Sequence, residues 1–471
     1  MARIDTDICI IGAGSGGLSV AAGAVQMGAR VVLVEGGEMG GDCLNYGCVP
    51  SKALIASAKH AHAMTTGAPF GIAPVEPRID YAAAKDRVRR VIETIAPVDS
   101  QERFEGLGVR VIRAHARFVS DREVEAGGDT IRARRFVVAT GSHPLVPDIP
   151  GLADVPYHTN ETIFDLRERP DRLIVVGGGP IGMEMAQAHR RLGCEVTVLS
   201  AGAPLAKDDP ELAAIVVERL REEGVVVEEG ARVSRVSGEG GVTVHTEDGR
   251  SFRGTHLLLA VGRKAVVDGL DLDAAGIDHT PKGITVGDDL RTTNRRAYAI
   301  GDVAGRMQFT HVAGYHAGVV VRSIVLGLPA KAREDHIPWA TYTDPELAQV
   351  GLTEAQAREA HGDRVEVARF DFHENDRAQA EGATTGLIKV MVVRGRPVGA
   401  SIVGQGAGDL IGVWALALAN RLKMSQMTAM VAPYPTLGEV SKRAAGAYFA
   451  PRLFDNAAVS RAVRAVQRWL P

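Results

Sequence analysis

The stretch DICIIGAGSGG, residues 7–17, carries three glycines in the spacing GxGxxG, at Gly12, Gly14 and Gly17. An apolar run before them predicts a buried strand, and a helical pattern follows them. Glycines at this spacing permit a tight turn and let a diphosphate approach the start of the helix, where peptide dipoles favour negative charge. The stretch therefore predicts a Rossmann-like unit that binds a dinucleotide.

Glu35 closes the next predicted strand, VVLVE, where a carboxylate can accept hydrogen bonds from ribose hydroxyls. The same glycine spacing recurs after the apolar run LIVV, at Gly177, Gly179 and Gly182. Because each fingerprint follows a predicted strand and opens a predicted helix, we expect two bound dinucleotides.

The second fingerprint lacks the acidic residue, because its strand EVTVLS ends at Ser200. A 2′-phosphate on the ribose would meet less repulsion there. Lys207 would add a positive charge for that phosphate, unless it is only a solvated lysine of a loop. We therefore expect NADPH or NADH at this site and favour NADPH.

Composition and charge exclude several classes of protein. Hydrophobic residues make up 45% of the 471 residues and charged residues 24%, the balance of a globular protein. The net charge of −3 gives no electrostatic basis for binding nucleic acid. A buried-strand pattern begins within seven residues of the N-terminus, and no apolar run approaches the ~18 residues of a spanning helix. We expect a cytoplasmic protein.

Cys43 and Cys48 make up half of the four cysteines of the chain. Residues five apart diverge in a regular helix, so the two sulfurs can bond only where the backbone is irregular, as Gly47 permits. Pro50 predicts the first turn of a helix with Cys48 at its N-terminus, where the helix dipole and Lys52 favour a thiolate. A redox dithiol is favoured over an inert pair and over a zinc site, which no second pair completes.

These residues resemble a known family. The segment CLNYGCVPSK is similar to the active-site signature of the class I flavoprotein disulfide reductases, which include glutathione reductase, dihydrolipoyl dehydrogenase and mercuric reductase. The resemblance covers essentially the whole chain, since further motifs follow in the expected order: FVVATGSHP, LLLAVGRK, TTNRRAYAIGDV, TDPELAQVGLTE and PTLGE.

The resemblance implies an α/β fold with two Rossmann-like domains, for FAD and NAD(P)H, and a C-terminal α+β domain that forms a homodimer. A Pro-rich boundary near PDIPG and a change of pattern near Pro338 give the expected limits. These limits are 1–148 with 271–337 for FAD, 149–270 for NAD(P)H, and 338–471 for dimerisation. Asp302 would bind the ribityl hydroxyls of FAD, and Gly141 and Gly262 would line the cofactor sites.

The resemblance also implies roles around the cysteines. Cys48 would lie against the flavin, and Cys43 would exchange with the substrate. Lys52 and Glu184 match the buried pair that the family keeps near the flavin. Nicotinamide hydride would reduce the flavin, and the flavin would reduce the disulfide.

The sequence departs from the family near its C-terminus. Where the family's disulfide reductases carry HPTxxE, this chain has YPTLGE, with Tyr434 in the His position and Glu439 in the Glu position. A tyrosine is a poor base near neutral pH. Mercuric reductase also has a tyrosine here, but it uses a C-terminal cysteine pair, and the last cysteine of this chain is Cys194.

We therefore expect an NAD(P)H-dependent flavoprotein oxidoreductase whose acceptor is an unidentified thiol, disulfide, metal or quinone-like compound, either a small molecule or a small protein. One alternative is a dihydrolipoyl dehydrogenase that works despite Tyr434. Another is a redox-sensing flavoprotein that binds a partner or a membrane through its basic tail.

The tail APRLFDNAAVSRAVRAVQRWLP has an amphipathic helical pattern. Its apolar positions are Val459, Ala462, Val463, Val466 and Leu470, and its arginines include Arg461, Arg464 and Arg468. Residues 452–471 are a candidate contact with a membrane surface or a partner. The alternative is a terminal helix that packs on its own domain.

Overall fold

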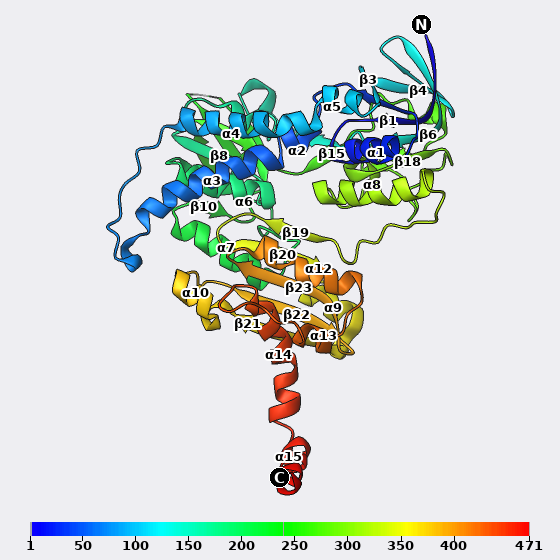
Figure 1. Cartoon of the computed structure of the whole chain (residues 1–471). Coiled ribbons are helices and arrows are strands. Elements are labelled where there is room, and N and C mark those ends of the chain that lie inside the picture. The colour runs from blue at the N-terminus through cyan, green and yellow to red at the C-terminus, as the bar shows by residue number, and fades with distance from the viewer. Residues whose placement is uncertain (1, 239, 471) are drawn as a thin grey trace.

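Three main β-sheets organise the chain, which the computed structural model describes over residues 2–238 and 240–470 (Figure 1). The first sheet has seven strands in the order β3-β2-β1-β6-β5-β4, with β18 also paired to β6. Strands β3, β2, β1, β6 and β18 pair in parallel, and β4 and β5 extend the sheet antiparallel. Their bounds are β1 Arg3–Ile11, β2 Val31–Glu35, β3 Arg110–Arg113, β4 Ala116–Ser120, β5 Glu123–Ala126, β6 Asp129–Val138 and β18 Ala297–Ala299.

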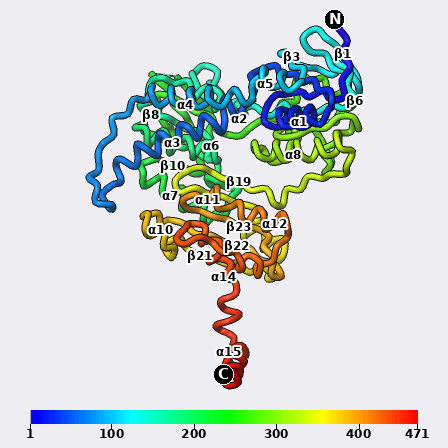
Figure 2. Tube along the Cα trace, viewed as in Figure 1, coloured from blue at the N-terminus to red at the C-terminus, as the bar shows by residue number. Residues whose placement is uncertain are grey.

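The end of β1, residues 8–11, is buried throughout. This burial is expected of a central parallel strand in a sheet that helices cover on both faces. Helix α1 (Ser15–Gln26) follows β1 and packs beside α8 (Thr310–Ile324). Figure 2 shows these two segments, far apart in the sequence, side by side. The first sheet is therefore completed by a segment near residue 300.

The second sheet repeats the strand–turn–helix unit in four parallel strands, in the order β10-β9-β8-β14. Its elements are β8 Arg172–Val176, α6 Pro180–Arg191, β9 Glu195–Leu199, α7 Pro210–Glu222, β10 Val226–Glu228 and β14 His256–Leu259. Between β10 and β14 lies a small antiparallel sheet of β11 Val233–Ser237, β12 Val242–Thr246 and β13 Ser251–Gly254.

Helices α3 (Cys48–Thr65) and α4 (Tyr81–Ile95) pack on the second sheet's side of the molecule, although they follow β2 of the first sheet. Leu54 of α3 shares a buried core with Met183 of α6 and Leu173 of β8. At the start of α3, the Cys48 sulfur lies 3.5 Å from the Thr310 hydroxyl of α8, so the helix also contacts an element that packs on the first sheet.

The third sheet is antiparallel, in the order β19-β20-β23-β22-β21. Trp414 is fully buried in its core, and its indole Nε1 donates a hydrogen bond to Ser441 at 3.1 Å. The elements are β19 Pro338–Thr341, β20 Glu346–Gly351, α9 Glu354–His361, β21 Val365–Asp371, α10 Asp376–Glu381, β22 Leu387–Val393, β23 Arg396–Gly404, α11 Ala407–Leu410, α12 Gly412–Ala419, α13 Met424–Thr428, α14 Glu439–Phe454 and α15 Ala457–Trp469.

The predicted α/β fold is confirmed, with two parallel Rossmann-like sheets and a C-terminal α+β region. Shorter elements complete it: α2 Gly41–Asn45, α5 Gln101–Gly106, β7 Ser142–Pro144, β15 Arg263–Ala265, β16 His279–Thr280 and β17 Gly283–Ile284. Among the helices of the described residues, none combines the length and the apolar character needed to cross a bilayer.

Candidate active site

The first glycine loop is shaped by close backbone contacts. Gly12 has φ +106°, and a Cβ there would lie 2.4 Å from the carbonyl oxygen of Ala139. A Cβ on Gly17 would lie 1.9 Å from the carbonyl oxygen of Gly12. These two glycines are therefore required by packing between β1, α1 and the end of β6.

Gly14 has a different role. A Cβ on Gly14 would meet only the Cα of Gly41, at 4.0 Å. Gly14 is also the N-cap of α1, and its position provides no side-chain hydrogen bond to the first N–H groups of the helix. Open space beside uncapped N–H groups fits the diphosphate of a dinucleotide.

The second loop repeats this division of roles. Gly177 has φ +121°, and its Cβ would lie 2.2 Å from the carbonyl oxygen of Ala260, while a Cβ on Gly182 would lie 1.9 Å from that of Gly177. A Cβ on Gly179, the N-cap of α6, would meet nothing within 4 Å. Both loops thus fit the same kind of ligand.

One cavity of about 2280 Å³ contains both loops. Gly17 and Gly182 do not line this cavity and instead contact the backbone of their own loops. The other predicted cofactor residues line it: Gly12, Gly14, Glu35, Gly141, Gly177, Gly179, Ser200, Lys207, Gly262 and Asp302. The cavity also contains four of the predicted catalytic residues: Cys43, Cys48, Lys52 and Glu184. The two dinucleotide loops and the cysteine pair therefore open into one continuous space.

Acidic and polar side chains at the cavity wall are already fixed by neighbours. Glu35 accepts hydrogen bonds from the backbone N–H groups of Ala13, at 2.5 Å, and Gly37, at 2.6 Å. Asp302 accepts a hydrogen bond from Ser142, and burial raises the pKa of the Asp302 carboxyl. Both carboxylates are thus held in place at the wall of the cavity.

The predicted NAD(P)H residues differ in exposure. Ser200 is buried at the end of β9, and its side chain lies against the backbone of Gly178 in the glycine loop. Lys207 is exposed on the loop between β9 and α7. An exposed lysine at the cavity wall is free to reach a phosphate, and no carboxylate occupies the Ser200 position to oppose it.

The cysteines lie on either side of a break between two helices. Cys43 is in α2, and Cys48 is the first residue of α3, as the sequence predicts. Both are free thiols. Gly47 lies at the break, where a Cβ would come within 2.8 Å of the Asp42 carboxylate. The residues between the cysteines therefore form a tight turn that brings the two sulfurs together.

The two thiols have different acidities. A hydrogen bond from Cys43, together with the Thr310 hydroxyl 3.5 Å away and the charge of Lys52, lowers the pKa of Cys48 to about 6. The same hydrogen bond and burial raise the pKa of Cys43. Near neutral pH, Cys48 is therefore a thiolate and Cys43 keeps its proton.

Lys52 and Glu184 form the predicted ion pair, with 2.7 Å between Nζ and Oε2. Glu184 is buried, and its other oxygen accepts a hydrogen bond from the backbone N–H of Tyr342 at 2.9 Å. The Tyr342 ring lies 4.5 Å from the Lys52 ammonium, which adds a cation–π contact. The pair thus joins α3, α6 and the segment after β19.

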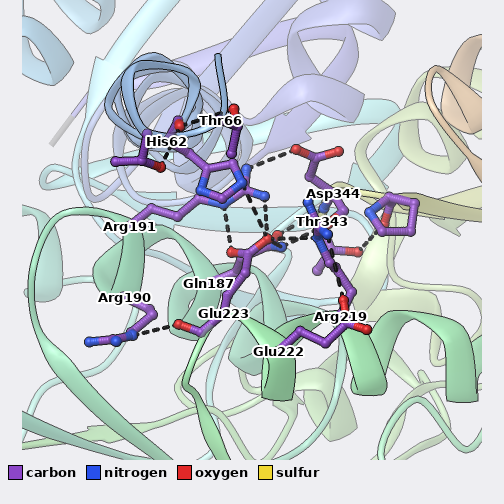
Figure 3. Close-up of polar contacts among 12 residues, drawn as sticks. His62, Thr66, Gln187, Arg190, Arg191, Arg219, Glu222, Glu223, Thr343 and Asp344 are labelled. Carbon is purple, nitrogen blue, oxygen red and sulfur yellow. Dashed lines mark hydrogen bonds and ion pairs between the residues drawn. The ribbon is translucent and has the colours of Figure 1, made fainter. Parts of the chain in front are cut away.

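A polar network fixes the rest of α6 to the same segment (Figure 3). Gln187 accepts a hydrogen bond from the backbone N–H of Asp344 at 2.8 Å and donates one to its carbonyl at 2.9 Å. Arg191, which is buried, pairs with Asp344 at 2.9 Å and with Glu223 of the α7 end at 2.6 Å. The position of Glu184 is therefore set by contacts along its whole helix.

Tyr434 and Glu439 do not join the cysteines within one chain. The Tyr434 side chain is 69% exposed, and its hydroxyl donates a hydrogen bond to Asp376 at 3.0 Å. Neither Tyr434 nor Glu439 is among the residues that line the cavity of Cys43 and Cys48. Tyr434 and Glu439 therefore lie outside the cavity that holds the cysteines of the same chain.

Sequence reasoning missed Thr310, Tyr342 and Arg263. Arg263 lies in the quoted motif LLLAVGRK, and it pairs with Asp42 at 3.0 Å and donates to Ser142 at 2.7 Å. Tyr342 directly precedes the motif TDPELAQVGLTE, so that motif pointed to its neighbourhood. Thr310 has no local signal, because it reaches Cys48 only through the packing of α8.

Comparison with protein families gives two matches. A model described as pyridine nucleotide-disulphide oxidoreductase matches residues 6–317. A model described as the dimerisation domain of that oxidoreductase matches residues 337–445. Together they span both Rossmann-like sheets and the antiparallel sheet.

Similar proteins include several reductases. A mercuric reductase from Streptomyces lividans is 34% identical, over 93% of this chain and 95% of its own length. A dihydrolipoyl dehydrogenase from Bacillus subtilis (strain 168) is 33% identical, over 92% of this chain and 96% of its own length. Among solved structures, the HOCl-induced flavoprotein disulfide reductase RclA from Escherichia coli, also solved as a Cu(II) complex, has TM-scores of 0.84 in both forms. The first form is 28% identical, over 93% of this chain and 99% of its own.

The acidity of Cys48 predicts the pH dependence of its alkylation. In protein without bound FAD, we expect iodoacetamide to modify Cys48 at a rate that rises through a midpoint near pH 6. Cys43→Ala removes the main hydrogen-bond donor and should move this midpoint toward about 8.5, and Thr310→Val should move it less. Peptide mass spectrometry measures the rates, with buried Cys9 and Cys194 as unreactive internal controls. A wild-type midpoint above about pH 8 would contradict the proposed thiolate.

The glycine loops predict opposite effects of two similar substitutions. Gly14→Ala places a methyl group in open space, so we expect the thermal stability of the FAD-free protein to change by less than about 2 °C. FAD affinity should fall at least about tenfold, because the methyl group takes the place of the diphosphate. Gly17→Ala should instead destabilise the FAD-free fold, because its Cβ meets the Gly12 carbonyl. Thermal unfolding and FAD fluorescence titration separate the two, and equal unfolding effects would refute the distinction.

Proposed function

The chain belongs to the pyridine nucleotide-disulphide oxidoreductase family, and on that premise we propose that Cys43 and Cys48 form its redox-active disulfide. It is an NAD(P)H-dependent flavoprotein oxidoreductase that passes electrons to a disulfide and on to an acceptor, and its dimerisation domain makes it a homodimer. The resemblance seen in the sequence is thereby confirmed. The observation that carries the residue assignment is the thiolate–thiol pair in the cavity shared by both dinucleotide loops.

We propose that residues 1–148 and 271–337 bind FAD, that 149–270 bind NAD(P)H, and that the region 338–471 contains the dimer contact. The open space at Gly14 and at Gly179 supports a diphosphate at each loop. Bound FAD supplies a ring that takes hydride from the nicotinamide and gives two electrons to the disulfide. Because NAD(P)H is supplied inside cells, we propose a cytoplasmic location.

The chain's own residues hold the charges that this exchange produces. When two electrons break the Cys43–Cys48 bond and one proton is taken up, Cys43 holds that proton and Cys48 remains a thiolate. Lys52 lies close enough to favour the negative charge on Cys48, and Glu184 keeps Lys52 in position. We propose that this ion pair holds α6, which follows the glycine loop of the NAD(P)H site, next to the helix that begins at Cys48.

We propose a thiophilic metal cation, such as Hg(II) or Cu(II), as the acceptor. A thiolate at neutral pH binds such cations, and their reduction needs no proton for a leaving thiol. Reduction of one Hg(II) to Hg(0), or of two Cu(II) ions to Cu(I), takes two electrons from the two sulfurs, forms the disulfide bond and releases the Cys43 proton. The names of the mercuric reductase relatives and the Cu(II) complex of RclA are consistent with this chemistry.

Tyr434 supports the metal over a disulfide acceptor. We propose that Tyr434 and Glu439 act at the cysteine pair of the partner subunit, because within their own chain they lie outside the cavity. Asp376 raises the pKa of Tyr434, which makes it a still weaker base. Lipoamide, a disulfide, remains the second candidate acceptor, because a dihydrolipoyl dehydrogenase is a relative over nearly its full length.

A steady-state screen of the FAD-loaded enzyme tests the acceptor. We expect Hg(II) or Cu(II) to support faster NAD(P)H oxidation than lipoamide, glutathione disulfide or a quinone, and NADPH to have the lower KM. Cys43→Ala and Cys48→Ala should each lower the metal-dependent rate at least about 100-fold. Cys194→Ala, at a buried cysteine, is the matched control and should keep the rate. Slow turnover with every acceptor would instead favour a redox sensor.

A substitution at Tyr434 tests the argument about proton transfer. Tyr434→His supplies a base with a pKa near 6.5, so we expect lipoamide turnover at pH 7 to rise at least about tenfold while metal reduction is unchanged. Tyr434→Phe is the control, because it removes the hydroxyl without adding a base. An unchanged lipoamide rate in Tyr434→His would show that proton transfer does not limit this reaction.

A further inference from the structure

The C-terminal tail comprises residues 452–471, and its described part, 452–470, extends away from the body of the molecule (Figures 1 and 2). The first half of α14 is anchored on the third sheet by buried residues such as Val440, Ala444 and Tyr448. From residue 451 to 470, every residue except the half-buried Val459 is exposed, and α15 has no buried residue. The expectation that the terminal helix packs on its own domain is therefore not met within this chain.

Helix α15 separates apolar and charged residues. At about 100° per residue, Val459, Val463 and Val466 share one face, and Arg461, Arg464 and Arg468 share the opposite face. No Asp or Glu occurs between residues 457 and 471. The helix thus presents a narrow apolar face and a purely cationic face.

The end of α14 adds to the apolar face. Leu453 and Phe454 line a shallow hollow of about 540 Å³ together with Val459 and Val463 of α15. Phe454 is 79% exposed, and Trp469 near the other end of α15 is 87% exposed. Two large aromatic side chains therefore stand unburied beside the valine face.

The position of the tail sets it apart from the family's dimer contact. The dimerisation domain matched by the family model ends at residue 445, within α14. A second copy of α15 would bring three more arginines and no carboxylate, so like charges would repel across a contact between two α15 helices. Arg452, at the start of the tail, pairs with Glu366 of β21, but among the described residues no carboxylate pairs with Arg461, Arg464 or Arg468.

We propose that the tail binds the surface of an anionic lipid membrane. An amphipathic helix lies in the interface with its apolar side chains among the acyl chains, and its cations meet negatively charged headgroups. Aromatic residues such as Phe454 and Trp469 suit that boundary, since one part of it is apolar and the other wet. The enzyme would thus be attached peripherally by a helix that its fold leaves free.

The membrane proposal is independent of the acceptor. The tail lies outside the cavity that holds the cysteines, so removing it should leave NAD(P)H oxidation in solution unchanged. Loss of membrane binding and loss of turnover are therefore separate readouts.

Flotation of the FAD-loaded full chain with vesicles tests the proposal. We expect recovery with phosphatidylglycerol-containing vesicles at low salt, and at least about tenfold less with pure phosphatidylcholine vesicles or at 0.5 M salt, roughly the range where screening removes surface attraction. Deletion of residues 452–471 and the triple variant Arg461→Gln/Arg464→Gln/Arg468→Gln should each lower recovery at least about tenfold.

A matched charge control guards against a nonspecific effect. Arg89→Gln/Arg90→Gln/Arg132→Gln removes three exposed arginines from the body and should keep the recovery of the wild-type chain. Val463→Ser/Val466→Ser should lower recovery while keeping the net charge. Equal flotation of the full and shortened chains would overturn the proposal. So would a larger oligomer in solution that the deletion abolishes without any vesicle binding, because the tail's occupant would then be a second copy.

Discussion

The ion pair between Lys52 and Glu184 is the contact on which the arrangement of this molecule depends. A carboxylate as buried as Glu184 must be paired and hydrogen-bonded, because an unpaired charge in that position costs several kcal/mol. Its two oxygens use a lysine of α3 and a backbone N–H of the segment after β19. One side chain therefore ties together the cysteine helix, the second Rossmann-like sheet and the antiparallel sheet.

The lysine of this ion pair also influences the redox chemistry of the cysteines. The ammonium that pairs with Glu184 also lowers the pKa of Cys48, and Cys43 and Thr310 donate toward the same sulfur. These three sources of stabilisation come from α2, α3 and α8. The difference in charge between the two cysteines thus depends on how these three helices pack together, and the CLNYGCVPSK segment supplies only part of it.

What the sequence predicted follows from the range of each interaction. The glycine spacings, the helix that begins at Cys48 and the strand before each loop are short-range features, and all are present in the structure. The pairing of Lys52 with Glu184 was reached through resemblance, since 132 residues separate them. Thr310, 262 residues from Cys48, was missed because no local pattern marks a contact made by tertiary packing.

The tail illustrates what a local sequence pattern does not determine. Its predicted helix is confirmed by α15, but helical periodicity alone does not identify the surface that covers an apolar face. An amphipathic pattern predicts burial only if a neighbouring surface exists within reach. Here the last turns of α14 carry α15 past the edge of the third sheet, so the face stays open (Figure 1).

The polar network along α6 has a consequence for motion between parts of the molecule. Gln187 and Arg191 join α6 to the segment after β19, so the second Rossmann-like sheet and the antiparallel sheet are linked at several points and not at one. A rotation at this boundary would break several polar contacts at once and leave their groups unpaired. The second Rossmann-like sheet and the antiparallel sheet are therefore expected to move as one rigid body.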